Sequence, residues 1–174
     1  MGMKISDRLR VVYDNLLVGK DVWDFCCDHG YLGVAAYKSR KFADVFFVDQ
    51  VDSIIAKLKN NFNTFVHDDL NPSQVHFILE RGELINRDVG GTVCISGVGA
   101  FVIYDILCGL AKKKFLSAER LILGPHRDTE KLIKMLANEE NLKNYELSRI
   151  CEVTENERKR SLLIFDRRKI PLSS

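Results

Sequence analysis

The sequence predicts an α/β fold in which helices cover both faces of a mostly parallel sheet that ends in a C-terminal antiparallel hairpin. Two observations lead to this prediction. Short apolar runs alternate with segments of helical periodicity through most of the chain, which is typical of strand–helix–strand crossovers. Two last apolar runs are separated only by a short charged turn, so they are expected to pair antiparallel.

Each element is predicted from its own local pattern. Apolar residues at helical spacing predict helices over 5–16, 33–39 and 101–111, with others after Asp52, after Pro72, and from Asp128 or Thr129. Short apolar runs predict the strands Val22–Phe25, Ala43–Val48, Asn63–His67, Thr92–Ile95, Arg120–Leu123, Tyr145–Glu152 and Ser161–Asp166. Ser6 and Asp52 are the expected caps of the helices that follow them.

Length and composition indicate a single globular domain over residues 1–174. Hydrophobic residues make up 46% of the chain and charged residues 29%, and no apolar run is long enough to span a bilayer. The first 20 residues are amphipathic and interrupted by charge, unlike a secretory signal. We therefore expect a cytoplasmic protein without a membrane partner.

The cysteines point to the same compartment. Their number is odd, and most of them lie inside apolar runs: Cys26, Cys27, Cys94, Cys108 and Cys151. Reduced, buried thiols explain this distribution better than disulfides. The adjacent pair Cys26-Cys27 has neither metal-ligand nor redox spacing, so no metal site is expected.

The net charge of +2 is a weak indication of the partner. A dedicated nucleic-acid-binding protein is usually more basic, with its cations on one face. Lysines and arginines cluster here at 112–114, 158–160 and 167–169. Each cluster alone is more typical of a solvated loop or helix end than of a phosphate site.

The segment 22–33, VWDFCCDHGYLG, is the most informative part of the chain. It has the pattern of a strand, a tight turn and the start of a helix, and such a turn lies at the sheet edge where nucleotide cofactors bind. A dinucleotide fingerprint would be G-x-G-x-x-G, but Cys26 occupies its first glycine position. Gly30 and Gly33 still allow the backbone to approach a ligand closely.

Acidic residues follow the first three predicted strands. Asp24 ends the first, and Asp49, followed by Gln50, ends the second, 19 residues after Gly30 and near the spacing expected for a ribose-binding carboxylate. Asp68 and Asp69 follow the predicted third strand, where a polar group would hold an adenine ring. The alternatives are structural: Asp24 could bind the turn backbone, Asp49 could cap a helix, and Asp68 could stabilise a turn.

The end of the fourth predicted strand is the second candidate site. Ser96, Gly97 and Gly99 combine a hydroxyl with backbone that can approach a ligand, although a plain turn into the next helix has the same composition. His29 would face the same crevice, and the alternative is a structural hydrogen bond.

Four segments, in order, resemble the bacterial tRNA (adenine-N1)-methyltransferase family of TrmK type. Residues 24–32 resemble its D-x-G-x-D-H-[AG]-Y-L signature, and residues 95–99 with 103–107 resemble its I-x-G-M-G-G motif and the helix behind it. Residues 5–9 resemble its opening L-S-x-R-L, and 121–126 its L-I-L-Q-P-N. The resemblance implies the Rossmann-like, seven-stranded fold of class I methyltransferases.

The chain departs from this family at three places in the motifs. Cys26 replaces a glycine, Ala100 replaces the second glycine of the fourth-strand motif, and Gly124-Pro125-His126 replaces Gln-Pro-Asn. The family also carries a C-terminal helical extension that grips tRNA. None is expected here, because the chain ends soon after the last predicted strand.

The resemblance implies S-adenosylmethionine (SAM) as the cofactor and N1 of an adenine in the D-arm of tRNA as the methyl acceptor. The cofactor-binding residues would be Asp24, Cys26, Gly30, Asp49, Gln50, Asp68, Asp69, Gly97 and Gly99. The catalytic residues would be Asp28, His29 and Ser96, with Asp28 or His29 as the proton acceptor.

Three alternatives stay open. The chain could be a methyltransferase of a small molecule or a protein, a catalytically silent SAM-binding domain, or a different Rossmann-type nucleotide-binding module. The partner is expected to be tRNA or another RNA, and the oligomeric state is not indicated.

Overall fold

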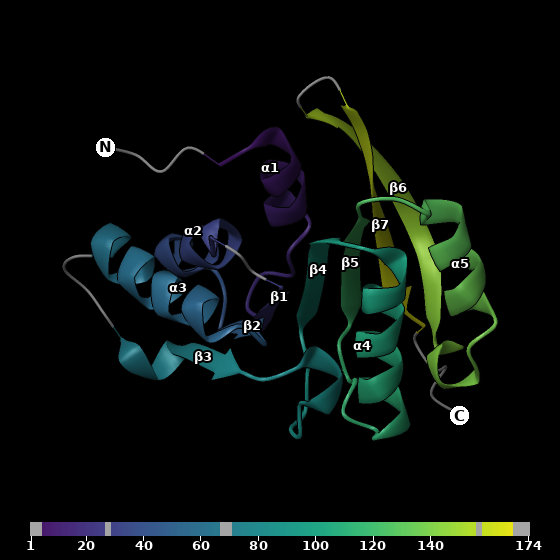
Figure 1. Ribbon diagram of the computed structural model, residues 1–174, viewed down its shortest axis with the longest axis horizontal. Helices are drawn as coiled ribbons and strands as arrows, with labels where there is room; N and C mark the ends of the chain where they lie inside the picture. Colours follow the sequence, from purple (N-terminus) through teal and green to yellow (C-terminus); the bar gives the residue numbers. More distant parts are fainter. Residues whose placement is uncertain (1–4, 27–28, 67–70, 156–157, 169–174) are drawn as a thin grey trace.

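A seven-stranded sheet with the strand order β3-β2-β1-β4-β5-β7-β6 forms the centre of the molecule (Figure 1). The computed structural model describes residues 5–26, 29–66, 71–155 and 158–168. Strands β1 to β5 run parallel, and β7 is antiparallel to both β5 and β6. The bounds are β1 Val22–Phe25, β2 Val45–Asp49, β3 Val75–Leu79, β4 Thr92–Val98, β5 Arg120–Pro125, β6 Tyr145–Glu155 and β7 Arg158–Arg167. The predicted fold class and terminal hairpin are confirmed.

Helices cover both faces of this sheet (Figure 1). The helical segments are α1 Asp7–Asp14, α2 Tyr31–Ser39, α3 Asp52–Phe65, α4 Ala100–Lys112 and α5 Thr129–Ala137, with short 3-10 turns η1 Pro72–Gln74, η2 Gly82–Leu84 and η3 Glu140–Leu142. Buried residues of α1, α2 and α3 form a core on one face, and those of α4 and α5 form a core on the other.

Strand β2 shows how the sequence builds both cores at once. Val45 and Phe47 belong to the core under α2 and α3, whereas Phe46 and Val48 belong to the core under α4. All five residues of the strand are buried, which is why it appears in the sequence as a continuous apolar run rather than an alternating one. The same holds for β1, whose predicted bounds are confirmed.

The third strand was predicted in the wrong place. Residues 63–65, expected to begin a strand, belong to α3, and β3 lies at Val75–Leu79 instead. Phe62 is buried and its ring packs edge-on against Phe47 and Phe77, with centroids 6.1 and 5.8 Å apart, so tertiary packing holds this segment helical. The helix expected after Pro72 is only the 3-10 turn η1.

The N-terminal helix and the terminal hairpin follow the predicted chemistry. The hydroxyl of Ser6 accepts a hydrogen bond from the backbone N–H of Leu9 at 3.3 Å, which confirms the expected cap. Strand β6 pairs with β7 from Tyr145 opposite Arg167 to Glu155 opposite Arg158. Among the described helices, none has the length and apolar character needed to cross a bilayer.

Candidate functional site

The turn after β1 begins with Cys26 in an unusual backbone conformation. Its φ is 58°, in the left-handed region that favours glycine, while its backbone N–H still donates to the carbonyl of Val48 at 2.9 Å. The departure from glycine in the sequence therefore falls on a position whose backbone favours glycine. The chain keeps the turn and accepts a strain of about 1–2 kcal/mol for the added Cβ.

Gly30 and Gly33 are required by packing. A Cβ at Gly30 would lie 2.3 Å from the side chain of Leu58, and one at Gly33 would lie 2.3 Å from the ring of Phe47. Gly30 also has a positive φ of 66° as the residue before α2. These glycines bring α2 close against β2 and α3, and α2 in turn fixes the position of the turn.

A cavity of about 260 Å³ lies on one side of this turn. We call it the histidine cavity, and it is lined by Arg8, Leu9, Asp24, Cys26, His29, Gly30, Tyr31, Leu32, Ser96, Gly97 and His126. Its walls come from the start of α1 and the ends of β1, β4 and β5. The carboxyl ends of parallel strands meet at one edge of the sheet, so residues far apart in sequence converge here.

A second cavity, of about 280 Å³, lies on the other side of the turn. We call it the β2–β3 cavity, and it is lined by Phe25, Cys26, Val48, Asp49, Gln50, Val51, Ile54, Glu80, Gly82, Glu83, Val98, Val102 and Ile106. Cys26 borders both cavities. The two spaces are thus separated by the turn that the sequence marked as most informative.

Asp24 is the buried charge of the histidine cavity. Asp24 is only 7% exposed, and burial raises the pKa of its carboxyl from 3.8 to about 7. A backbone hydrogen bond from Gly33 lowers this pKa, whereas the negative charge of Asp49 raises it further. Within the described part of the chain no cation contributes to this shift, and Arg8, which lines the same cavity, pairs with Glu155 instead.

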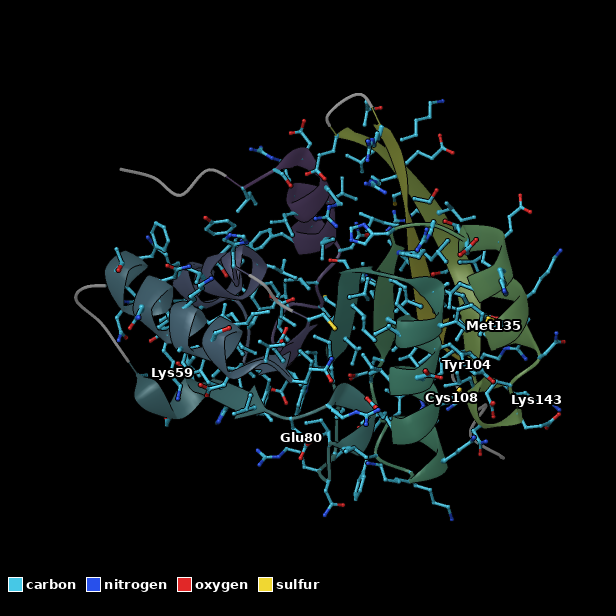
Figure 2. The ribbon with its side chains drawn as sticks, viewed as in Figure 1. Lys59, Glu80, Tyr104, Cys108, Met135 and Lys143 are labelled. Carbon is cyan, nitrogen blue, oxygen red and sulfur yellow. The ribbon has the colours of Figure 1, made fainter. Side chains whose placement is uncertain are left out.

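The β2–β3 cavity is acidic. Asp49 is 9% exposed and its carboxylate accepts a hydrogen bond from the backbone N–H of Val51 at 2.9 Å, which orients it at the end of β2. Glu80 follows β3 directly (Figure 2), and Glu83 pairs with Arg81. Carboxylates accept hydrogen bonds from hydroxyl and amine groups and repel phosphates. The cavity suits a nucleoside better than a pyrophosphate.

The thiol of Cys26 is kept neutral by this acidic setting. Burial is the main cause that raises the pKa of this thiol to about 12, and the charges of Asp49, Asp24 and Glu83 act in the same direction. Because the thiolate is the nucleophilic form, Cys26 is inert at neutral pH. It occupies space between the two cavities without adding a reactive group.

The comparisons with known proteins agree with this arrangement. A model of a methyltransferase domain matches residues 5–159, which is most of the chain. The chain belongs to the methyltransferase domain family. Among curated protein sequences, none matches it.

Solved structures share the fold of this methyltransferase domain. Sp1610 of Streptococcus pneumoniae, a candidate tRNA (m1A22) methyltransferase, has a TM-score of 0.82 at 20% identity over 98% of this chain and 74% of its own. TrmK of M. capricolum, solved with S-adenosyl-homocysteine, has a TM-score of 0.77 at 19% identity, over 97% of this chain and 72% of its own. The B. subtilis m1A22 tRNA methyltransferase TrmK has a TM-score of 0.78 at 21% identity, over 95% of this chain and 68% of its own. The expected Rossmann-like methyltransferase fold is confirmed.

The structure of the methyltransferase domain brings most of the predicted site residues to the two cavities. Asp24, Cys26, His29, Gly30, Ser96 and Gly97 line the histidine cavity, and Asp49 and Gln50 line the other. Gly97 has a φ of 82°, and a Cβ added to it would meet no atom within 4 Å, so its backbone is open to a ligand. Gly99 precedes α4 as its N-cap. Asp28, Asp68 and Asp69 lie outside the described residues.

Two glutamates, a histidine and an arginine of the cavity walls were not predicted as site residues. Glu80 and Glu83 follow the true β3, whose position the sequence pattern did not reveal. His126 and Arg8 stand in segments that the family resemblance covered, and their polar character was the available signal. The acids that the structure shows after β3 are these glutamates, whereas the role predicted for Asp68 stays a prediction because that residue lies outside the described part of the chain.

Proposed function

We propose that this methyltransferase uses SAM and methylates N1 of an adenine in tRNA. The observation that carries the first half is Asp24, a carboxyl on the wall of the histidine cavity whose burial raises its pKa to about 7, while Arg8 of the same wall is paired with Glu155. A ligand with a cationic group at this point would relieve that cost. The methionine end of SAM carries an ammonium group.

The rest of the cavity edge fits the same cofactor. Asp49 stands at the end of β2, where a carboxylate accepts hydrogen bonds from ribose hydroxyls, and Glu80 and Glu83 suit the amine-bearing adenine end. Carboxylates on both sides of the turn would repel a dinucleotide's pyrophosphate. A cationic nucleoside is the ligand class that these charges favour. When bound, SAM supplies a methyl group attached to a positively charged sulfonium.

The other side of the histidine cavity is available to the methyl acceptor. Ser96, Gly97, His29 and His126 line it with hydroxyl, imidazole and backbone groups, which can hydrogen-bond the polar edge of a base. Neutral adenine N1 is a competent nucleophile, so the main task of these residues is to hold the base in line. The base must leave its stack to enter. An imidazole, or Asp28 as proposed from the resemblance, would take the proton that the exocyclic amine loses.

The choice of tRNA is supported by the neighbours rather than by the cavities. The structures of similar fold include two TrmK proteins, and the motif resemblance to that family spans residues 5–126. We place the protein in the cytoplasm, because tRNA is modified there and the described cysteines are free thiols.

Two measurements test the proposal. Calorimetric titration with SAM should show binding, and Asp49→Ala should weaken it by on the order of 1–3 kcal/mol, while Asp52→Ala, three residues along and exposed, should not. Methyl transfer from labelled SAM to unmodified tRNA, followed by nucleoside analysis, should yield N1-methyladenosine. Absence of SAM binding at millimolar concentration would reject the cofactor. Binding with transfer only to small molecules or proteins, or with no transfer at all, would reject the tRNA assignment.

A further inference from the structure

The β6–β7 hairpin extends beyond the rest of the sheet at the edge that carries the two cavities (Figure 1). Strand β5 pairs with β7 from Arg120 opposite Asp166 to Leu123 opposite Leu163. Residues 158–160 pair only with β6, through 153–155. A two-stranded ribbon therefore projects past the carboxyl end of β5, and it carries Arg158, Lys159 and Arg160.

This ribbon is attached to the wall of the histidine cavity by two contacts. The guanidinium of Arg160 donates to the carbonyl of His126 at 2.8 Å, and Glu155 pairs with Arg8 at 3.3 Å. His126 and Arg8 both line the cavity. Arg158 and Lys159 are exposed, and no carboxylate of the described residues forms an ion pair with either of them. As far as the described residues go, the ribbon thus presents two cations that form no ion pair beside the mouth of the site.

A second group of cations lies on the α4–α5 side of the same edge. Arg127 precedes α5 and Lys131 lies in its first turn; both are exposed, and the ammonium of Lys131 lies 4.4 Å from the ring centroid of Phe101. Phe101 is the second residue of α4 and is 52% exposed, which is unusual for a large aromatic side chain. Its neighbour Val102 lines the β2–β3 cavity.

The charges at this edge are sorted by position. Four charged side chains that line the cavities are carboxylates, Asp24, Asp49, Glu80 and Glu83, and the lining cation Arg8 is paired with Glu155. Outside the cavities, next to the exposed acids Asp128, Glu130 and Glu152, are the cations that we call the basic rim: Arg127, Lys131, Arg158, Lys159 and Arg160. A net charge of only +2 hides this separation. Acids inside favour a cationic cofactor, and cations outside favour a polyanion that brings the acceptor.

We propose that the basic rim binds the phosphate backbone of the RNA substrate and that Phe101 stacks on an unpaired base next to the target adenine. The inference rests on the proposed function and assigns the substrate a docking surface within this chain. Cations on two sides of the mouth contact phosphates on both sides of the target nucleotide. An exposed aromatic ring between them offers the stacking platform that proteins use for unstacked bases.

The phosphate contacts are tested with a matched pair of double variants. Arg158→Gln with Lys159→Gln removes two rim cations without touching the Arg160–His126 contact. Lys112→Gln with Lys114→Gln removes two exposed cations at the C-terminal end of α4, at the opposite edge of the sheet. Binding of fluorescent tRNA transcript is measured by anisotropy at several salt concentrations, together with SAM affinity by calorimetry.

The rim variant should bind tRNA on the order of tenfold more weakly at low salt, with the slope of log K against log salt smaller by about 2. The control variant should bind tRNA like the parent, and both should bind SAM like the parent. Equal effects of the two variants, or no effect of the rim variant, would overturn the docking surface. A parent that binds SAM but no RNA would instead overturn the proposed function itself.

Phe101 is tested by methyl-transfer kinetics. Phe101→Ala should raise KM for tRNA on the order of tenfold with little change in KM for SAM, and Phe101→Tyr should restore the parental value because it retains an aromatic face. Thermal unfolding of both variants shows whether the fold is intact. An unchanged KM in a folded Phe101→Ala variant, or failure of the tyrosine to restore it, would overturn the stacking role.

Discussion

Replacing Asp24 with asparagine is predicted to stabilise the ligand-free protein while impairing its cofactor site. The Asp24 carboxyl is buried and its pKa is raised from 3.8 to about 7. The unfolded chain ionises this group more easily than the folded chain does, so the folded state loses stability as pH rises between these two values. Asparagine has nearly the same shape, and its carbonyl can still accept the hydrogen bond from Gly33.

The size of the effect follows from the two pKa values. They differ by about 3 units, and each unit corresponds to about 1.4 kcal/mol, so ionising Asp24 costs the folded protein about 4 kcal/mol well above pH 7. Below pH 3.8 both states are protonated and the cost vanishes. The variant should therefore exceed the parent in unfolding free energy by about 4 kcal/mol at pH 8.5 and by little at pH 4.

Urea unfolding from pH 4 to pH 8.5 measures this difference. Asp52→Asn, which removes an exposed carboxylate, is the control and should show no comparable dependence on pH. In parallel, Asp24→Asn should bind SAM more weakly by on the order of 2–3 kcal/mol, because Asp24 is the residue that we propose as the charged partner of the ammonium. A constant difference between variant and parent across this pH range would refute the argument that Asp24 is an uncompensated buried acid.

Three further predictions concern packing, the turn and acid stability. Gly33→Ala should destabilise the fold by about 1–3 kcal/mol in urea, because its Cβ would meet a buried ring at 2.3 Å, whereas Gly90→Ala makes ordinary contacts and should cost less. Cys26→Gly should retain or improve SAM binding in calorimetry, because the backbone there favours glycine. Weaker binding would show that the Cys26 side chain contributes contacts that the cofactor site requires. Glu139 has a pKa lowered to about 2 by hydrogen bonds from Asn141 and from Tyr104, which is labelled in Figure 2. Its stabilisation is therefore lost as the pH falls from 4.5 towards 2, and Tyr104→Phe should reduce that loss in acid titrations of unfolding.

The sequence predicted best the parts of the fold that are buried on both faces. Val22–Phe25 was placed without error because every residue of β1 is buried, which produces an uninterrupted apolar run. The hairpin was placed because its two strands need only a short turn. Strand ends were less certain, since β4 and β5 continue to Val98 and Pro125, beyond the predicted Ile95 and Leu123.

The edge strand was missed for a physical reason. β3 is only half-buried, contains His76 and begins directly after the turn at 72–74, so it lacks the apolar run that marks an interior strand. Its predicted substitute contained Phe65 and Val66, which have strand propensity, but Phe65 is the last residue of α3 and Val66 is the C-cap of that helix. Asp68 was assigned from that error. The role of Asp68 stays a prediction, and Glu80 and Glu83 are the acids that the structure shows after β3.

Cys26 links the sequence, the backbone and the site chemistry. Its side chain stands where the resembling family has glycine, in a conformation that favours glycine, between two cavities that share it as a wall. A thiolate at this position would be alkylated by a methyl sulfonium, since the thiolate is a strong nucleophile. Burial raises the pKa of this thiol to about 12, and the surrounding carboxylates act in the same direction. Burial, with a smaller contribution from these charges, thus keeps the one cysteine bordering both cavities in the described structure in the form that does not attack a methyl donor.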